Sequence, residues 1–369
     1  MRLFSCQNCA QILFFENTRC ERCQHRLGFL ADADQTLFAL VPAEGAGDAS
    51  TETWTAIGVR DRAFRFCANA QHDVCNWLVD ASSGETMCEA CRHNRVIPEL
   101  SDASNRLAWR KIEHAKHRLF YTLYRLGLAQ YIDLDAPHDP LVFQFLADYP
   151  NVKGQKVMTG HDDGVVTIAL SEADDAEREL RRKMMGEPYR TLLGHFRHEV
   201  GHYFWDRLVR DGGKLAECRA VFGDDEEDYQ ASLKRHYEKG PPLDWQERYV
   251  SAYATSHAWE DFAETWTHYL HIVDTLEMAQ ALDIKLAPAV DHDGEFAVSY
   301  GLDPYRAADI NALIDVWLPV STALNSLSRT MGRDELYPFI LSPPVIEKLG
   351  FVHRLVHDFV RAGDARQAA

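Results

Sequence analysis

The cysteines of this chain are distributed very unevenly along its length. Eight of the nine cysteines precede residue 92, and only Cys218 follows them. The first four form two C-x-x-C pairs, Cys6 with Cys9 and Cys20 with Cys23. Each short turn aims two sulfurs at one point, so two such pairs can surround a tetrahedral zinc ion. This pattern predicts a structural zinc site with four cysteine ligands, built on a small β-turn-β ribbon.

A second group of cysteines follows: Cys67, Cys75, Cys88 and Cys91. Only its last two members have the tight C-x-x-C spacing. We expect these four to form a second structural zinc site, although the spacing also allows pairs to be exchanged between the two groups. His72 and His93 are alternative donors in place of a sulfur. Residues 1–97 are therefore predicted to be a zinc-ribbon module with too little hydrophobic core to fold without metal.

The remaining residues, 98–369, are predicted to form a second, mostly helical domain. Apolar residues recur at helical spacing from Ala103 to about Leu128. Residues 157–170 have instead the pattern of two strands around a turn at 161–164, which predicts a small antiparallel sheet. The expected fold class is α+β, with a four-cysteine zinc-ribbon module followed by this mostly helical domain.

One predicted helix carries a metal-binding motif. Residues 198–202 have the sequence H-E-V-G-H, and an uninterrupted apolar face predicts a helix that begins near residue 189. Histidines four residues apart lie on the same side of a helix, so His198 and His202 can bind one zinc ion. Glu199 lies beside them, where it can act as a general base on a zinc-bound water without binding the metal.

A catalytic zinc ion with two histidine ligands needs a third protein ligand. Glu260 and Glu264 share one face of a later helix, for which Ser256 is the expected N-cap. We expect Glu260 to bind the metal and Glu264 to orient a histidine ring through its N–H group. Other histidines compete as donors: His195, His257, His268 and His271. The lone histidine of the predicted turn, His161, is expected to have no metal role.

These patterns together resemble a family of bacterial zinc-binding metallopeptidases with an N-terminal zinc ribbon. The motifs that carry the resemblance are the N-terminal cysteines, C-A-N at 67–69, C-N-W-L at 75–78, T-G-H at 159–161 and W-E-D-F-A-E at 259–264. The likeness covers nearly the whole chain, and its two helical motifs are similar to the gluzincin arrangement. It implies that Glu260 binds the metal and that Glu264 contacts a ligand without binding the metal itself. It also implies that Tyr253 donates a hydrogen bond to the oxyanion; Tyr249 is the alternative candidate for this role.

The expected activity is hydrolysis of a peptide or isopeptide bond in a peptide or protein substrate. Zinc on His198, His202 and Glu260 would activate a water, and Glu199 would take its proton. Strand 165–170 would accept the substrate as an added β-strand. A competing hypothesis is an adaptor protein, in which the zinc ribbons bind a protein partner and the H-E-V-G-H domain is structural. Nothing in the sequence identifies the residues on either side of the scissile bond.

The formal net charge of −17 argues against a nucleic-acid or membrane-surface partner, because a polyanion would repel the chain. Part of this charge lies in the acidic, loop-rich region 211–248, for which a lid that favours basic substrates is one hypothesis. The apolar runs are too short to cross a bilayer, and the N-terminus lacks the apolar region of a signal peptide. We therefore expect a cytoplasmic protein with one catalytic and two structural zinc ions.

Overall fold

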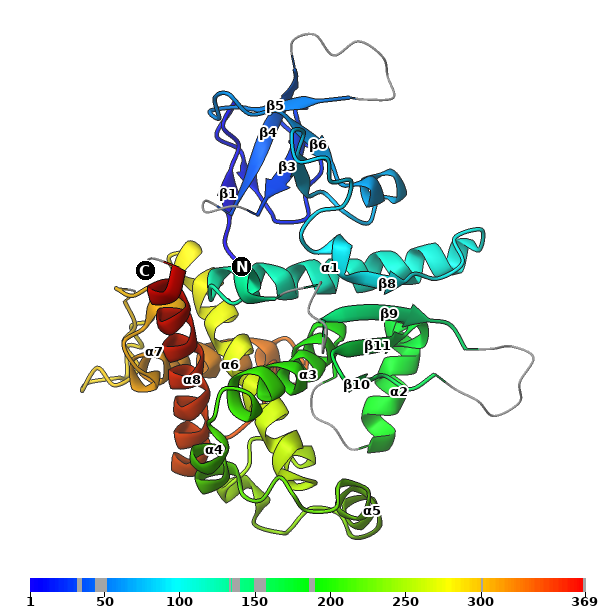
Figure 1. Cartoon of the computed structure of the whole chain (residues 1–369). Coiled ribbons are helices and arrows are strands. Elements are labelled where there is room, and N and C mark those ends of the chain that lie inside the picture. The colour runs from blue at the N-terminus through cyan, green and yellow to red at the C-terminus, as the bar shows by residue number, and fades with distance from the viewer. Residues whose placement is uncertain are drawn as a thin grey trace. The chain divides into compact units, whose positions relative to one another are not determined.

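The chain divides into two compact units in its computed structural model. The structure describes residues 1–31, 35–43, 52–132, 134, 140–148, 157–185, 190–299 and 301–367. The first unit comprises residues 1–124, 133–160 and 165–175, and the second comprises residues 125–132, 161–164 and 176–369. Strands dominate the start of the chain and helices the rest (Figure 1), so the predicted α+β class, with a zinc ribbon before a mostly helical part, is confirmed.

The ribbon at the start of the first unit contains two turns of the same backbone geometry. Strands β1 (Phe4–Ser5) and β2 (Ile12–Leu13) pair antiparallel around the first C-x-x-C turn. The amide groups of Ala10 and Gln24 each donate a 2.8 Å hydrogen bond to the carbonyl of the first cysteine of their pair. Both residues have left-handed backbones, with φ of 60° and 62°. Each cysteine pair is thus followed by a sharp chain reversal, as a metal-binding turn requires.

A five-stranded antiparallel sheet follows the first cysteine group, and its last strand lies between Cys75 and Cys88 of the second group. Its strands, in spatial and chain order, are β3 (Arg26–Leu30), β4 (Thr36–Pro42), β5 (Trp54–Ala56), β6 (Phe64–Phe66) and β7 (Leu78–Asp80). The amide of Phe29 also donates a 2.8 Å hydrogen bond to the carbonyl of Asn76, just before β7, so the sheet curls toward closure. The buried core of this sheet consists of Leu30, Phe38, Leu40, Trp54, Ala56, Phe64 and Leu78.

The zinc-ribbon module therefore has a hydrophobic core of its own, in contrast to the expectation of a module with little core. Strands β5, β6 and β7 are only three residues long, too short for an alternating pattern to stand out. Their side chains form a core only after the antiparallel pairing brings the strands side by side.

A second sheet of four strands is in the order β10-β11-β9-β8. Its elements, with the helix that follows β8, are β8 (Asn94–Val96), α1 (Ala103–Arg125), β9 (Val142–Leu146), β10 (Gly160–Asp162) and β11 (Val165–Ala169). The predicted turn is present at Asp163 and Gly164, whose φ angles of 43° and 80° are those of a two-residue hairpin.

The prediction that the small sheet is antiparallel is wrong for most of it, because β11 and β8 both pair with β9 in parallel. Strand β11 lies between β10 and β9, and it runs in the same direction as β9. The alternation of apolar residues within a strand does not indicate which strands become its neighbours in the sheet or in which direction they run. Since both edges of β11 are paired, the expectation that strand 165–170 accepts a substrate strand is also wrong.

The second unit is built around one buried helix. Its helices are α2 (Asp175–Met185, which begins in the first unit), α3 (Leu192–Phe204), α4 (Leu215–Phe222), α5 (Tyr229–Lys239), α6 (Ala258–Ala281), α7 (Ile310–Thr330) and α8 (Pro343–Gln367). Seventeen of the twenty-four residues of α6 are buried, because it contacts α3, α7 and α8 on different sides. Figure 1 shows α3 lying against α6.

The N-caps of α3 and α6 are Thr191 and His257. The Thr191 hydroxyl caps α3 by accepting a 3.0 Å hydrogen bond from the amide of Gly194, and the predicted start near residue 189 lies outside the described residues. The cap of α6 is His257, whose Nδ1 accepts from the amide of Trp259 at 3.1 Å. Ser256 does not cap the helix, because its own backbone is already helical whereas an N-cap is extended.

The acidic region 211–248 is more ordered than its composition suggests. It contains α4, α5 and a single turn of 3-10 helix at Trp245–Glu247. The Asp228 carboxylate accepts a 2.9 Å hydrogen bond from the amide of Ala231, so the cluster of acidic residues provides the N-cap of α5.

Helix α3 continues directly into a π-helix, Trp205–Arg210, a rare element that often occurs beside functional sites.

The glycine of the H-E-V-G-H motif lies at a close contact between α3 and α6. A Cβ atom at Gly201 would lie 3.1 Å from the Cα atom of Ala263 and 3.2 Å from Cδ1 of Trp266. These distances are shorter than an ordinary van der Waals contact. The rings of Phe204 and Trp266 stack one turn further along, with centroids 4.9 Å apart. A side chain at position 201 would therefore separate the two helices.

We predict that Gly201→Val lowers the free energy of unfolding by about 1–3 kcal/mol, because the added methyl groups overpack the contact between α3 and α6. Urea unfolding followed by tryptophan fluorescence measures this change. Gly301→Val is the control, since a Cβ at Gly301 meets no atom within 4 Å and its backbone is not left-handed. Equal stability of the two variants would contradict the packing argument.

Candidate metal centres

Two helices of the second unit bring the predicted histidine motif and Glu260 together. One donor atom from each of His198, His202 and Glu260 lies within 4.8 Å of the other two. Oε2 of Glu260 is 2.9 Å from Nε2 of His198 and 3.5 Å from Nε2 of His202. Two imidazole nitrogens and one carboxylate oxygen thus face a single point, which is the donor set of a three-ligand zinc site.

Glu264 lies behind this point and holds one of the rings. Its Oε1 accepts a 2.8 Å hydrogen bond from Nδ1 of His198, and its Oε2 accepts a 2.6 Å hydrogen bond from the hydroxyl of Ser251. A proton on Nδ1 leaves Nε2 as the nitrogen directed toward Glu260 and His202. The carboxylate therefore fixes both the tautomer and the orientation of the ring, as carboxylates behind histidine ligands commonly do.

The buried carboxylates of Glu260 and Glu264 need positive charge beside them. Burial alone would lower the pKa of His198, but its hydrogen bonds to Glu260 and Glu264 raise it well above the ordinary value. Burial alone would likewise raise the pKa of Glu260, but His202 and His198 hold it well below the usual range. A divalent cation between these groups would supply the same positive charge. The donor set therefore fits zinc in both geometry and charge.

Glu199 is buried beside the donor set and is not part of it. Burial raises the pKa of its carboxyl group to about 7; the negative charges of Glu260 and Glu264 add to the rise, and His198 opposes it. A group with a pKa near neutrality can both accept and return a proton at physiological pH. Its position is that expected for the glutamate of the motif.

Two tyrosines lie close to the cluster, and only one of them was predicted. The centroid of the Tyr253 ring is 5.9 Å from that of His198. The alternative candidate, Tyr249, has its ring 4.1 Å from the Nζ atom of Lys348. The unpredicted residue is Tyr229, whose hydroxyl donates a 2.5 Å hydrogen bond to Oε1 of Glu260. Tyr229 is the first residue of α5, in the acidic region, and its spacing from the motifs contains no signal that could have identified it.

The competing histidines occupy other positions. Nδ1 of His268 lies 2.7 Å from the hydroxyl of Tyr337, and His257 caps α6. The ring of His161 stacks on that of His202 with centroids 6.1 Å apart, so this turn histidine lies near the site, but it belongs to no donor set among the described residues. None of the competing histidines belongs to a donor set among the residues that the structure describes.

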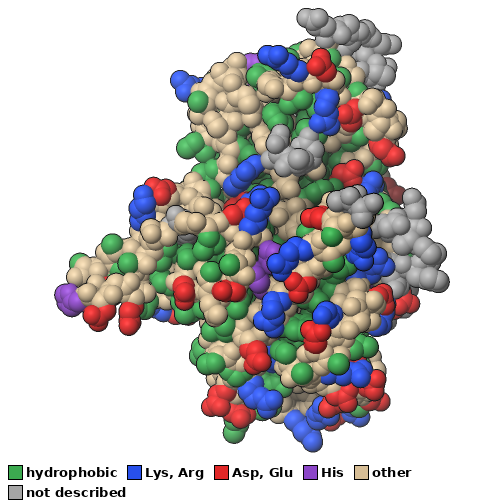
Figure 2. Space-filling view, turned by 60° about the vertical axis from the view of Figure 1, so that its left-hand side comes forward, with side chains coloured by type: hydrophobic (Ala, Val, Ile, Leu, Met, Phe, Trp, Pro, Cys, Tyr) green, Lys and Arg blue, Asp and Glu red, His purple; other side chains and the backbone are tan. Residues whose placement is uncertain are grey.

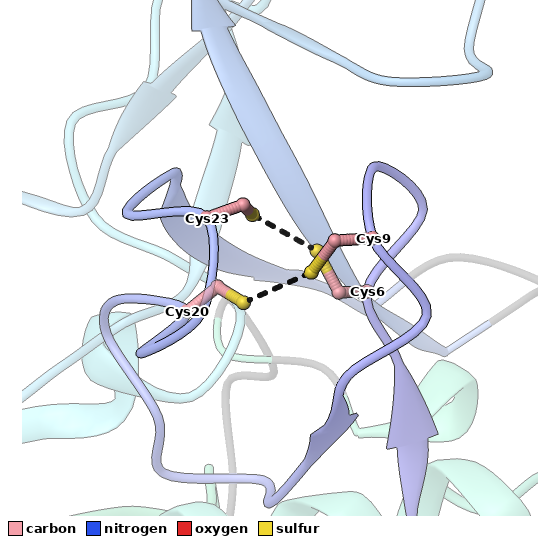
Figure 3. Close-up of side chains that lie close together, drawn as sticks. All are labelled: Cys6, Cys9, Cys20 and Cys23. Carbon is pink, nitrogen blue, oxygen red and sulfur yellow. Dashed lines mark hydrogen bonds between the residues drawn. The ribbon is translucent and has the colours of Figure 1, made fainter.

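The eight N-terminal cysteines form two separate clusters. In the first, Sγ of Cys6 lies 3.6 Å from that of Cys23, and Sγ of Cys9 lies 3.6 Å from that of Cys20. Figure 3 shows the four sulfurs converging between the two turns. The second cluster contains the remaining four: Cys67, Cys75, Cys88 and Cys91. Each cluster thus contains its own cysteines, and the structure shows no exchange of pairs between the two groups.

The histidines considered as substitutes for a sulfur lie outside the second cluster. His93 approaches the carbonyl of Leu141 through Nδ1 at 2.7 Å, and the ring of His72 lies against that of Trp109. A histidine that does lie beside this cluster is His117 on α1, whose Nε2 is 3.6 Å from Sγ of Cys91. His117 was missed because it resembles any other polar residue of an amphipathic helix.

Positive groups on α1 lie beside the second cysteine cluster. Nδ1 of His117 donates a 2.6 Å hydrogen bond to the carbonyl of Glu113, which turns Nε2 toward the sulfurs. Lys116 forms a 2.9 Å ion pair with the Glu113 carboxylate, and both side chains are completely buried. Four thiolates around zinc carry a net negative charge. Because Glu113 already neutralises Lys116, His117 is the group on α1 that would offset this charge when protonated.

Comparison with known proteins identifies the family of this chain. Residues 105–355 match the family described as "Putative zinc-binding metallo-peptidase", and residues 3–102 match a zinc-ribbon domain. The chain belongs to this metallopeptidase family and has an N-terminal zinc ribbon. Its relatives include uncharacterized proteins of Mycobacterium bovis and of two Mycobacterium tuberculosis strains, each 39% identical over 97% of this chain and 96% of the relative. No solved structure matches significantly.

The surface gives less information than the clusters. On the face shown in Figure 2, the described Lys and Arg side chains are interspersed with Asp and Glu rather than gathered in one area. Among the described residues, no helix combines the length and the apolar character needed to cross a membrane.

We predict that Glu260 and Glu264 affect zinc affinity to different degrees. Glu260→Ala removes a donor atom and should abolish tight binding at the histidine site. Glu264→Ala removes only the partner of a ligand and should weaken binding about 10–100-fold. Competition with a chromophoric chelator measures both affinities, and Glu238→Ala, an exposed glutamate of α5, is the control. A larger loss for Glu264→Ala than for Glu260→Ala would show that the two roles are exchanged.

Proposed function

We propose that this protein is a zinc-dependent peptidase that hydrolyses peptide or isopeptide bonds in a peptide or protein substrate. The observation that carries the proposal is the meeting of His198, His202 and Glu260 at one point, with the Glu199 carboxyl group buried beside them. Family membership supports a metallopeptidase role. The gluzincin likeness of the two helical motifs supports the same assignment of residues.

The side chains that would hold the catalytic zinc are His198 and His202 through Nε2 and Glu260 through Oε2. Nδ1 of His202 is buried and has no hydrogen-bond partner among the described residues, so this ring depends on its other nitrogen for a favourable contact. When bound, zinc would polarise the substrate carbonyl and lower the pKa of a water molecule. Glu264 would keep the His198 ring in its ligating orientation.

Glu199 is proposed to be the general base and then the general acid. Its carboxylate would take the proton of the attacking water and deliver it to the leaving amine. The pKa of about 7 places both protonation states within reach at neutral pH. The burial that raises this pKa would also exclude other water molecules from the carboxylate.

Tyr253 is proposed to stabilise the negative charge that develops on the substrate oxygen. Its ring lies against that of His198, and burial raises the pKa of its hydroxyl, which therefore remains a hydrogen-bond donor at neutral pH. A donor of this kind typically contributes about 3 kcal/mol to the stabilisation of a transition state.

The two cysteine clusters are proposed to hold structural zinc, which brings the number of zinc ions to three. Four thiolates close the coordination sphere, so neither cluster leaves a position for substrate. We keep the division into a zinc-ribbon module at residues 1–97 and a metallopeptidase domain at residues 98–369 as part of the proposal. The module would either bind a protein partner or support the catalytic domain.

We predict that Glu199→Gln reduces cleavage of a peptide library at least about 100-fold while all bound zinc is retained. The amide is similar in size to the carboxylate but cannot take a proton from water. Zinc content is measured on the same samples by atomic emission, and Glu238→Gln is the matched control. Identical cleavage profiles for the wild type and Glu199→Gln would contradict the proposal and favour the adaptor hypothesis.

A further inference from the structure

The two oxygens of the Glu260 carboxylate face different partners. Oε2 is directed toward Nε2 of His198 and Nε2 of His202, at 2.9 and 3.5 Å. Oε1 accepts the 2.5 Å hydrogen bond from the hydroxyl of Tyr229. The side chain of Glu260 is almost fully buried, so Tyr229 takes the place that solvent would occupy at an exposed carboxylate.

The ring of Tyr229 is held by contacts with two neighbouring rings. The ring lies edge-on to His257 at 5.3 Å and to Trp259 at 5.7 Å, with interplanar angles of 78° and 80°. Both neighbours belong to the start of α6, close to Glu260. Since Tyr229 is also the first residue of α5 after its Asp228 cap, the hydroxyl has little freedom to move away from the carboxylate.

A backbone contact joins the acidic segment to α6 at the same place. Nδ1 of His257 accepts from the amide of Trp259, so its proton lies on Nε2, which donates a 3.0 Å hydrogen bond to the carbonyl of Glu227. One turn before α6, the Thr255 hydroxyl lies 3.2 Å from Nδ1 of His236 on α5. The segment 227–236 is therefore attached to the start of α6 at several points.

We propose that Tyr229 is a positioning residue for Glu260, which it holds so that Oε2 alone faces the metal. This inference depends on the proposed function, because it takes Glu260 as the third zinc ligand. A carboxylate without the hydrogen bond to Oε1 can rotate or bind through both oxygens, which changes the number of positions left for water and substrate. The acidic segment is then part of the metal centre.

Tyr253 and Tyr229 are expected to have separable roles. The Tyr229 hydroxyl donates directly to Glu260, whereas the ring of Tyr253 lies against the ring of His198. Tyr229→Phe should therefore weaken zinc binding, and Tyr253→Phe should lower kcat with zinc affinity unchanged.

The decisive experiment measures the affinity of the full chain for zinc at the histidine site, by competition with a chromophoric chelator while the cysteine clusters retain their zinc. Tyr229→Phe is expected to bind this zinc about 10–100-fold more weakly than the wild type. Tyr131→Phe is the matched control, since the Tyr131 hydroxyl donates a 2.8 Å hydrogen bond to the Asp364 carboxylate and contacts no metal donor. An unchanged affinity in Tyr229→Phe would overturn the inference.

Cobalt(II) at the histidine site gives a readout that a general loss of stability would not change. The visible spectrum of bound cobalt reports the number of ligands, and Tyr229→Phe should shift it toward the higher number expected for a carboxylate that binds through both oxygens. The spectrum of Tyr131→Phe should equal that of the wild type. Identical spectra for Tyr229→Phe and the wild type would count against the positioning role.

Glu260→Ala, measured in parallel, separates the two proposals. If Glu260→Ala binds zinc as tightly as the wild type, the ligand assignment is wrong and the proposed function is contradicted. If Glu260→Ala loses zinc while Tyr229→Phe does not, the proposed function stands and only the role of Tyr229 is overturned.

Discussion

The close contact between α3 and α6 is the interaction on which the candidate site depends. Gly201 allows the backbone of α3 to approach Ala263 on α6, and one turn of each helix then faces the other. At this separation the two histidines of α3 reach the two glutamates of α6, His198 with both of them. Because α6 is held by α7 and α8 on its other sides, the glutamates are positioned by the core of the unit.

Contacts that depend on local spacing could be predicted from the sequence. Residues four apart on one helix, such as His198 and His202, must lie on one side of it, and C-x-x-C turns must aim two sulfurs together. The structure brings Glu260 to this pair and gathers the cysteines into two clusters. Their roles as zinc ligands, like that of Glu199, stay predictions until metal binding is measured.

Contacts between distant segments could not be predicted in the same way. Tyr229 lies 31 residues before Glu260, and only the folding of the acidic region onto α6 brings them together. His117 reaches the second cysteine cluster from a helix whose spacing indicates only an amphipathic face. The direction of β11 beside β9 depends on strand order, which no periodicity within a strand encodes. Each of these features is tertiary, and a single sequence contains no pattern for it.

The central claim is that two helices hold one metal ion between His198, His202 and Glu260. Anomalous diffraction at the zinc absorption edge, from crystals of the zinc-loaded protein, tests it most directly. The account predicts three peaks, one bound by these three side chains and one in each cysteine cluster. A zinc-loaded crystal with peaks in both cysteine clusters and no peak between the two histidines and Glu260 would contradict it.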